Sequence, residues 1–579
     1  MLPLRPLLCF VIACVALAIP IVIVDVAPSG DGPQHLLVAR AVANYDDDAL
    51  GYARFVEPQL PPSAEAFAEV LIALLTVLPW KAAYAAGLLL VLWGWTAAVA
   101  ILGRALKRPA WGVVVGVVTA YSWCFYLGLL PYCMATAIGL LAIALAVSTT
   151  TWTPRHVALL AFLLLACAHA HVFAAVLVGP VVLAIAARSE ARRRAVVAVV
   201  VAGLPALALS LFVATRDAPV VGSWVNSDLL ERASVVAWGF IGGPAWRAWP
   251  PVVVAVVGLV HGLRAGKCER SLAFAAGGLV VLAWLLPRDA PGWQLVSPRP
   301  LLLGMTLLLL LAEPARIIGS LRARTSVAVV VVVATLAWSA AFHLRFHAAI
   351  ADLRAHLEEP PAHPGLRFPV VFAPASMPPG SDVRFLNPFF NVGQLVAVAH
   401  GGWTAFTFSH LPIHMVRERR GMPPDPDRSL VTRMWLRDDD DKAAAFADLI
   451  SNARRYDSVV AFEDAADHER WIARGFAPDV REGHLQVLRF VGCRASVRVP
   501  AGVAVVENGF TPHSDRGATR RQRVSAGADV VDVTGLGCGP VWLRLLDAAG
   551  QPVPCAGVET LEVTASRDGP LALECAPQK

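Results

Sequence analysis

Long runs of apolar residues dominate the first 345 residues, and they limit the possible folds more than any other feature. A membrane helix needs about 20 apolar residues in succession, and runs of this kind recur with short basic connections between them. The chain is 57% hydrophobic and 16% charged, whereas a soluble domain carries about 25% charged residues. The pattern predicts a polytopic membrane protein. The net charge of +6 does not indicate nucleic-acid binding, because many basic residues lie between apolar runs.

The predicted fold of residues 1–345 is an all-α membrane bundle with about eleven transmembrane helices. The expected spans are 7–26, 82–103, 110–128, 132–149, 156–169, 172–187, 195–214, 249–263, 271–286, 300–313 and 325–343. The first run is too long for a signal peptide and has no convincing small-residue cleavage site, so we expect it to remain as a helix. The shorter run 66–79 is predicted to be an amphipathic helix on the outer membrane surface.

The basic residues of the connections set the orientation. Lys and Arg gather in the connections 104–108, 188–194, 264–270 and 316–324. With the N-terminus in the cytoplasm, these connections are cytoplasmic, as the positive-inside rule requires. The chain then leaves its last membrane helix on the outer side of a bacterial inner membrane, and the rest is extracytoplasmic.

The remaining residues have the composition of soluble protein. Residues 346–492 are predicted to form a soluble α/β domain, because strand-like and helix-like segments alternate there. The expected elements are strands at 368–374, 456–462 and 484–490 and a helix at 463–474. Residues 493–579 combine turn residues with Val-rich alternation and are predicted to form a small β-sandwich-like module.

Four cysteines gather near the C-terminus: Cys493, Cys538, Cys555 and Cys575. In an oxidising compartment this cluster predicts two disulfides, and four cysteines allow three pairings. Zinc is the weaker interpretation because the spacing is not of the CxxC type.

The segment Ser29–His35 follows the first predicted membrane helix and is the strongest candidate for a site. It places the carboxylate of Asp31 near the membrane surface, between two glycines that allow close approach of backbone and ligand. Pro33 predicts the start of a helix, and His35 lies one turn after Asp31, so both can face one pocket. The alternative is a solvated helix cap.

An Asp after the first membrane helix, followed by a long loop and a surface helix, resembles the GT-C superfamily of integral-membrane glycosyltransferases. The resemblance covers about residues 5–345. Its marks are Gly30-Asp31-Gly32-Pro33 with His35, Glu57-Pro58 through Pro61-Pro62, Tyr126-Leu127-Gly128, and His169 at an outer helix end. It implies a polyprenyl-phosphate sugar as donor, an extracytoplasmic acceptor, and Asp31 as the catalytic or metal-binding carboxylate. The implied metal is Mg²⁺ or Mn²⁺.

The sequence departs from the family at one place. Many members carry a second acidic residue at the outer end of the fourth helix, whereas the segment 126–133 has none here. A site with two carboxylates on a metal would need Asp46, Asp47 or Asp48, which read as a solvated loop.

Further candidates for substrate binding lie at other predicted outer helix ends: Tyr126, His169, His171, Asp289 and Arg299. The two histidines are two positions apart, so they cannot face the same way on a helix, and we expect one of them to face the Asp31 pocket. The prediction is that His169 converges there with Asp31, His35 and Arg299. Arg299 opens a helix at the height of a lipid phosphate, although simple anchoring at the interface explains it equally well.

The preferred function is therefore a membrane glycosyltransferase that uses a lipid-linked sugar. One alternative is a non-catalytic protein that uses the same bundle for lipid binding or envelope assembly. A transporter is the weaker alternative, because few charges lie inside the predicted helices and no paired broken helices are evident.

Overall fold

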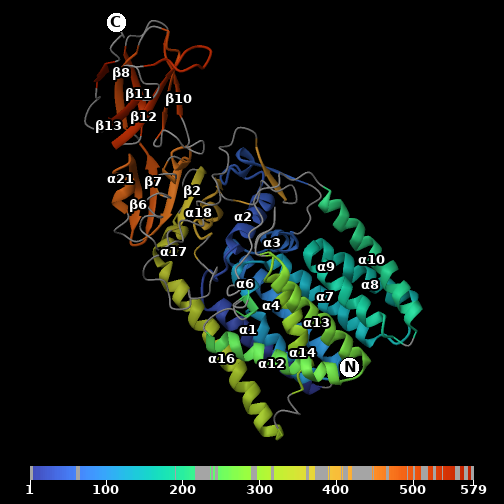
Figure 1. The fold of residues 1–579 in the computed structure, drawn as a ribbon. Coiled ribbons are helices and arrows are strands. Elements are labelled where there is room, and N and C mark those ends of the chain that lie inside the picture. The colour runs from blue at the N-terminus through green and yellow to red at the C-terminus, as the bar shows by residue number, and fades with distance from the viewer. Residues whose placement is uncertain are drawn as a thin grey trace.

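The computed structural model shows a helical bundle followed by a C-terminal region that contains β-sheets (Figure 1). It describes residues 4–59, 65–189, 191–215, 232, 235–236, 239–241, 245–287, 296–313, 319–359, 364–371, 389, 391–405, 407, 415–419, 446, 449–450, 452–463, 468–491, 493–499, 502–509, 520–525, 530–536, 539–554, 561–565 and 572–574. The helices before residue 350 are α1 (Leu4–Val22), α2 (Gly32–Ala43), α3 (Ala66–Leu75), α4 (Trp80–Ala105), α5 (Pro109–Ala120), α6 (Trp123–Leu127), α7 (Leu130–Ser148), α8 (Pro154–Ala170), α9 (Val172–Ala186), α10 (Arg192–Ala214), α12 (Ala245–Arg264), α13 (Lys267–Leu285), α14 (Arg299–Leu311) and α16 (Leu321–Ala349).

The apolar helices lie where the hydrophobic runs predict them, and the protein is a multi-pass membrane protein. Six helices within the described residues are long and apolar enough to cross a membrane. Several others, including α8, α9 and α14, are apolar but shorter, so the count of about eleven spans stays a prediction. Helices α2, α5, α7, α8 and α14 each begin with a proline in their first two positions, where its fixed φ and missing N–H cost nothing.

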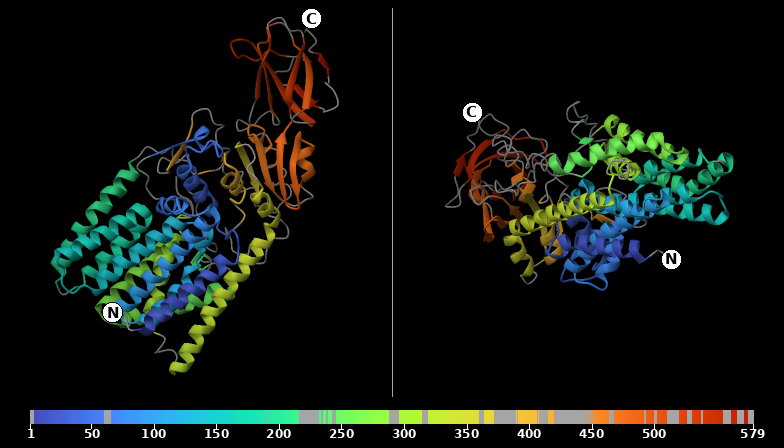
Figure 2. Two further views of the ribbon diagram at one scale, coloured as in Figure 1. Left: turned by 180° about the vertical axis from the view of Figure 1, so that it is seen from behind. Right: turned by 90° about the horizontal axis from the view of Figure 1, so that it is seen from below.

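The two ends of the bundle differ. Helices α2 and α3 lie at the end that meets the C-terminal sheets, while the N-terminus of α1 lies at the opposite end (Figures 1 and 2). Helix α3 has ten residues, too few to cross the hydrocarbon core. The long helix α16 runs along the side of the bundle and leads through α17 (Ala351–Glu358) into the sheets.

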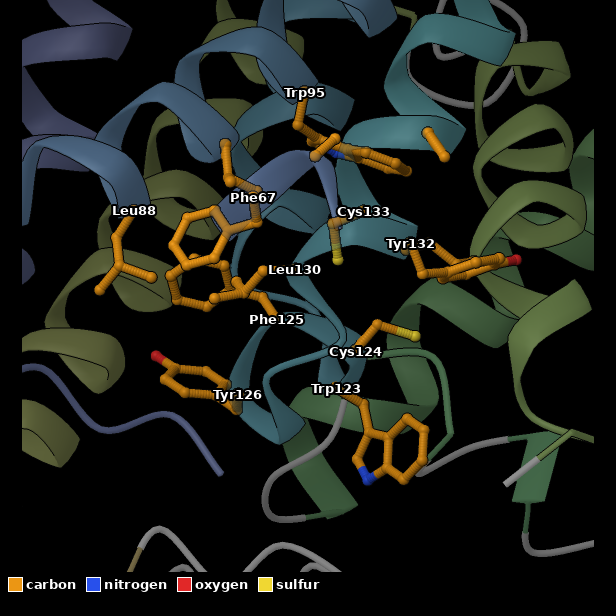
Figure 3. Packing of buried hydrophobic residues seen from close by; sticks show 14 of the residues in the cluster. Phe67, Leu88, Trp95, Trp123, Cys124, Phe125, Tyr126, Leu130, Tyr132 and Cys133 are labelled. Carbon is orange, nitrogen blue, oxygen red and sulfur yellow. The ribbon is translucent and has the colours of Figure 1, made fainter. Parts of the chain in front are cut away.

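The interior of the bundle around α6 is packed with aromatic side chains. Figure 3 shows Trp123, Phe125 and Tyr126 of α6 among the buried residues of the bundle. Tyr126 is 2% exposed, and its ring lies 5.1 Å from the ring of Phe342 and 5.8 Å from that of Trp338. Tyr126, a predicted substrate-binding residue, is therefore placed within the hydrophobic core, where it packs against side chains of α16.

The C-terminal region contains a five-stranded mixed sheet in the order β3-β2-β5-β7-β6. Its strands are β2 (Leu366–Val371), β3 (Trp403–Thr404), β5 (Ser458–Phe462), β6 (Phe476–Glu482) and β7 (Leu485–Phe490), accompanied by α18 (Gln394–His400) and α21 (His468–Ile472). The predicted strands overlap β2, β5 and β7. The predicted helix 463–474 overlaps α21, which is shorter.

The last part of the chain forms two further sheets. One has the order β10-β9-β12-β13 and the other β11-β8-β14. Their strands are β8 (Cys493–Arg498), β9 (Val505–Gly509), β10 (Arg520–Arg523), β11 (Val530–Leu536), β12 (Gly539–Leu546), β13 (Leu561–Ala565) and β14 (Ala572–Glu574). These strands lie in the segment that the sequence predicted to be β-rich. The domain boundaries at 345 and 492 stay predictions. Of the four C-terminal cysteines, Cys538, Cys555 and Cys575 and the side chain of Cys493 lie outside the described residues, so the two disulfides stay a prediction.

The predicted orientation can be measured by labelling in intact cells. Cysteines introduced next to Arg192, which begins α10, are expected to stay unlabelled by impermeant thiol reagents, because the basic segment before α10 is predicted to be cytoplasmic. Cysteines introduced into exposed positions of β6 are expected to react. Labelling next to Arg192 from outside would show that the predicted orientation of the whole bundle is wrong.

Candidate active site

Asp31 precedes α2 directly, in the chain segment that links it to α1. Backbone hydrogen bonds hold this segment against the end of α6: the Gly30 N–H donates to the Tyr126 carbonyl over 2.8 Å and the Asp31 N–H to the Leu127 carbonyl over 2.9 Å. The Asp31 side chain is half-buried and makes no capping bond to α2. The backbone at Asp31 is therefore held in place, and the carboxylate is not used to cap the helix.

Two glycines make this close approach possible. A Cβ on Gly30 would lie 2.6 Å from the Leu127 carbonyl oxygen, and a Cβ on Gly128 would meet the backbone N of Asp31. Gly128 also has φ of +89°, which a side chain disfavours. Gly30, one of the two glycines beside Asp31 where the sequence suggested room for a ligand, here lets two parts of the backbone approach each other.

We expect Gly128→Ala to lower the melting temperature clearly, because alanine is strained at positive φ and its Cβ would press on Asp31. The cost should exceed about 1 kcal/mol of unfolding free energy. Gly94→Ala is the matched control, since a Cβ there has nothing within 4 Å and alanine favours a helix interior. Thermal denaturation of both variants checks this, and equal melting temperatures would contradict the assigned role of Gly128.

His35 lies one turn into α2 and is 6% exposed. Its Nδ1 lies 3.7 Å from a carboxylate oxygen of Glu65, and its ring meets the Phe67 ring edge-on. Burial lowers the pKa of His35, although the negative charge of Asp31 opposes this shift. The imidazole is therefore neutral at neutral pH, and Asp31 is close enough to act on it electrostatically.

Arg299 is the first residue of α14 and is 7% exposed. Its Nη1 lies 2.9 Å from the Nε2 of His171. Because an arginine only donates hydrogen bonds, His171 accepts here and carries its proton on Nδ1. Tyr132 holds the same residue from α7, since its hydroxyl donates to the Arg299 carbonyl over 2.6 Å and its ring lies 5.7 Å from the guanidinium carbon.

The structure brings four of the predicted site residues into one neighbourhood. Arg299 interacts electrostatically with Asp31, and His171 does so with both Arg299 and His35. These residues come from α2, from the turn between α8 and α9, and from α14. The site thus joins a carboxylate, a guanidinium and two imidazoles at one end of the bundle.

His169 lies with a different partner. Its Nε2 lies 3.0 Å from both carboxylate oxygens of Glu69 in α3, and both side chains are partly exposed. Helix α8 ends at Ala170, and His171 is extended (φ −169°, ψ 112°), so the chain turns between the two histidines. His171, and not His169, therefore contacts Arg299.

Several site residues were missed by sequence reasoning: Glu65, Glu69, Tyr132 and Asn391. The amide of Asn391 donates to the Gly30 carbonyl over 2.8 Å and to the Asp31 Oδ1 over 3.2 Å. Nothing in the sequence connects Asn391 to Asp31. Glu69 had a usable signal, because it lies in the predicted surface helix 66–79, and Glu65 directly precedes that helix.

The other predicted candidates lie elsewhere. Asp46, Asp47 and Asp48 are exposed in the loop after α2, and Asp289 lies outside the described residues. Among the residues that the structure describes, no group of three His, Cys, Asp or Glu side chains is placed to hold a metal ion. The Mg²⁺ or Mn²⁺ that the family resemblance implies therefore stays a prediction.

Comparisons with known proteins find several similar solved structures, of which three follow. ArnT from Cupriavidus metallidurans in the apo state is 13% identical over 84% of this chain and 97% of that chain, with a TM-score of 0.44. The same protein bound to undecaprenyl phosphate is 12% identical over 84% and 98%, with a TM-score of 0.45. The Archaeoglobus fulgidus oligosaccharyltransferase in complex with Zn and sulfate is 11% identical over 98% and 100%, with a TM-score of 0.43. No family model and no curated protein matches the chain.

Proposed function

We propose that the protein is a membrane glycosyltransferase that moves a sugar from a polyprenyl-phosphate donor to an extracytoplasmic acceptor. The observation that carries the proposal is that the Asp31 carboxylate and the Arg299 guanidinium, which His171 and Tyr132 hold, lie in one neighbourhood at one end of the bundle. A transfer of this kind needs a base for the acceptor and a cation for the leaving phosphate. The pair supplies both, at the end of the bundle from which the lipid chain of a donor can extend along the membrane helices.

Asp31 has the chemistry of a general base. In the proposed reaction an acceptor hydroxyl attacks the anomeric carbon of the donor sugar, and its proton passes to the Asp31 carboxylate. A new bond forms between the acceptor oxygen and the anomeric carbon, and the bond from that carbon to the phosphate oxygen breaks. The bond electrons leave with the polyprenyl phosphate. His35 is neutral, so it adds no positive charge that would weaken the base.

Arg299 has the chemistry of a phosphate binder. A guanidinium presents several N–H donors in a planar fork that matches phosphate oxygens. It also begins α14, and the N-terminus of a helix attracts anions. His171 and Tyr132 hold the arginine in place. This arrangement favours the departure of a polyprenyl phosphate, whose negative charge increases as the bond breaks.

The test is transfer by the purified protein in lipid nanodiscs. Labelled sugars are supplied on a panel of polyprenyl-phosphate carriers and, in parallel, as nucleotide sugars, with an extracytoplasmic envelope extract as acceptor. We expect label to leave at least one polyprenyl-phosphate donor and free polyprenyl phosphate to appear in equal amount. If the protein binds polyprenyl phosphate but turns over no donor of the panel, the non-catalytic lipid-binding function is favoured instead.

A further inference from the structure

The C-terminal region reaches back to Asp31 through one side chain. Asn391 lies just before α18, 360 positions after Asp31, and is 4% exposed. Its amide nitrogen donates both to the Gly30 carbonyl and to the Asp31 carboxylate. One buried amide thus fixes the backbone before the carboxylate and the carboxylate itself.

Contacts on neighbouring segments hold Asn391 in this place. The hydroxyl of Tyr52, in the loop after α2, donates to the carbonyl of Ala397 in α18 over 3.0 Å. The Gly402 N–H, just after α18, donates to the Leu50 carbonyl over 2.7 Å. Strand β1 (Val56–Pro58) pairs with β4 (Val416–Glu418) from the C-terminal region. Helix α18 is therefore bound to the loop between α2 and α3 at several points, and the position of Asn391 does not depend on its own two bonds.

The direction of the hydrogen bond matters for the chemistry. A carboxylate in the role of a base uses one oxygen lone pair for the incoming proton, and its rotation must be restricted for that lone pair to face the acceptor. The Asn391 N–H occupies Oδ1 of Asp31. This hydrogen bond therefore also fixes the direction in which the other oxygen, Oδ2, points. His35 from α2 and Arg299 from α14 act on the same carboxylate electrostatically, and Asn391 donates a hydrogen bond to it.

We propose that Asn391 is a positioning residue that orients the Asp31 carboxylate, so that the C-terminal region completes the active site of the bundle. This inference rests on the proposed glycosyl transfer. It means that the C-terminal region takes part in turnover. It also explains why a polar side chain is buried where the two regions meet.

The first test uses the full-length protein and the donor found active. Asn391→Leu keeps a similar volume but removes the donor, and we expect kcat to fall about 10- to 100-fold while the Kd for polyprenyl phosphate stays unchanged. Asn391→Asp should lose more, because it places a second carboxylate against Asp31. Gln486→Leu is the control: it removes another fully buried amide of the C-terminal region, in β7, and should leave kcat unchanged. Unchanged kcat in Asn391→Leu would overturn the proposal.

The second test does not depend on activity. Melting temperatures are measured for Asn391→Leu, for Asp31→Ala and for the double variant. A hydrogen bond to a charged group makes the two losses non-additive, and we expect the double variant to melt about 2 °C or more above the value that additivity gives. Strictly additive losses in melting temperature would show that Asn391 and Asp31 do not interact as proposed. If the parent protein transfers no sugar while the losses remain non-additive, the proposed function fails and the contact between the two regions stands.

Discussion

Asp31→Asn is expected to lower the rate of sugar transfer by about 1,000-fold, which is within the range that general-base catalysis contributes. The change keeps the shape of the side chain and removes its negative charge and its capacity to accept a proton. Asn precedes a helix as well as Asp does, and the Asp31 side chain makes no capping bond to α2. The variant should therefore reach the membrane in normal amount and melt close to the parent.

The matched control is Asp46→Asn, which removes a carboxylate from the exposed loop after the same helix. It should retain full transfer. The measurement is initial rate of transfer at saturating donor, with membrane expression and melting temperature recorded in parallel. If Asp31→Asn retains more than about a tenth of the parent rate, the carboxylate is not the base. If both variants lose activity together, the loss has a cause other than the charge of Asp31.

Arg299→Gln is expected to lower transfer by about 100- to 1,000-fold, the range found when one charge-stabilising donor of an active site is removed. The loss arises because the cation acts on the charge that develops on the leaving phosphate. Arg299→Lys should restore only part of the rate. It returns the charge but not the planar fork of donors, and the N–H that reaches His171 is displaced.

Arg322→Gln provides the control, since it removes an exposed arginine near the start of α16. Binding and turnover separate the two roles of Arg299. The Kd for polyprenyl phosphate and the kcat for transfer are measured for each variant. If Arg299→Gln leaves both unchanged, Arg299 serves only to anchor α14, as the alternative interpretation of the sequence proposed. If Kd rises alone and kcat is kept, the arginine binds the donor without stabilising its departure.

The site could be predicted only in part, and His171 and His169 show why. The sequence indicated that one of the two histidines faces the Asp31 pocket, because residues two apart diverge on a helix. The histidine predicted to converge with Asp31 and Arg299 was His169, whereas the structure places His171 against Arg299. That choice depends on where α8 ends, and on the side from which α3 and α14 approach. The approach of Glu69 to His169 and of Arg299 to His171 is a result of helix packing, which local pattern does not encode.

The local amino-acid pattern was enough to predict most of the helices and several of the strands. Each apolar run becomes a helix because a helix satisfies its backbone hydrogen bonds within its own segment, and this depends only on local residues. Pro33 likewise places the start of α2, with Asp31 directly before it. Two contacts became visible only in the folded protein: Asn391 donates to Asp31 across 360 positions, and Gly128 makes room for the Asp31 backbone. Such contacts depend on how separate elements pack together. The free energy that selects one packing comes from the whole interior and not from a single local segment.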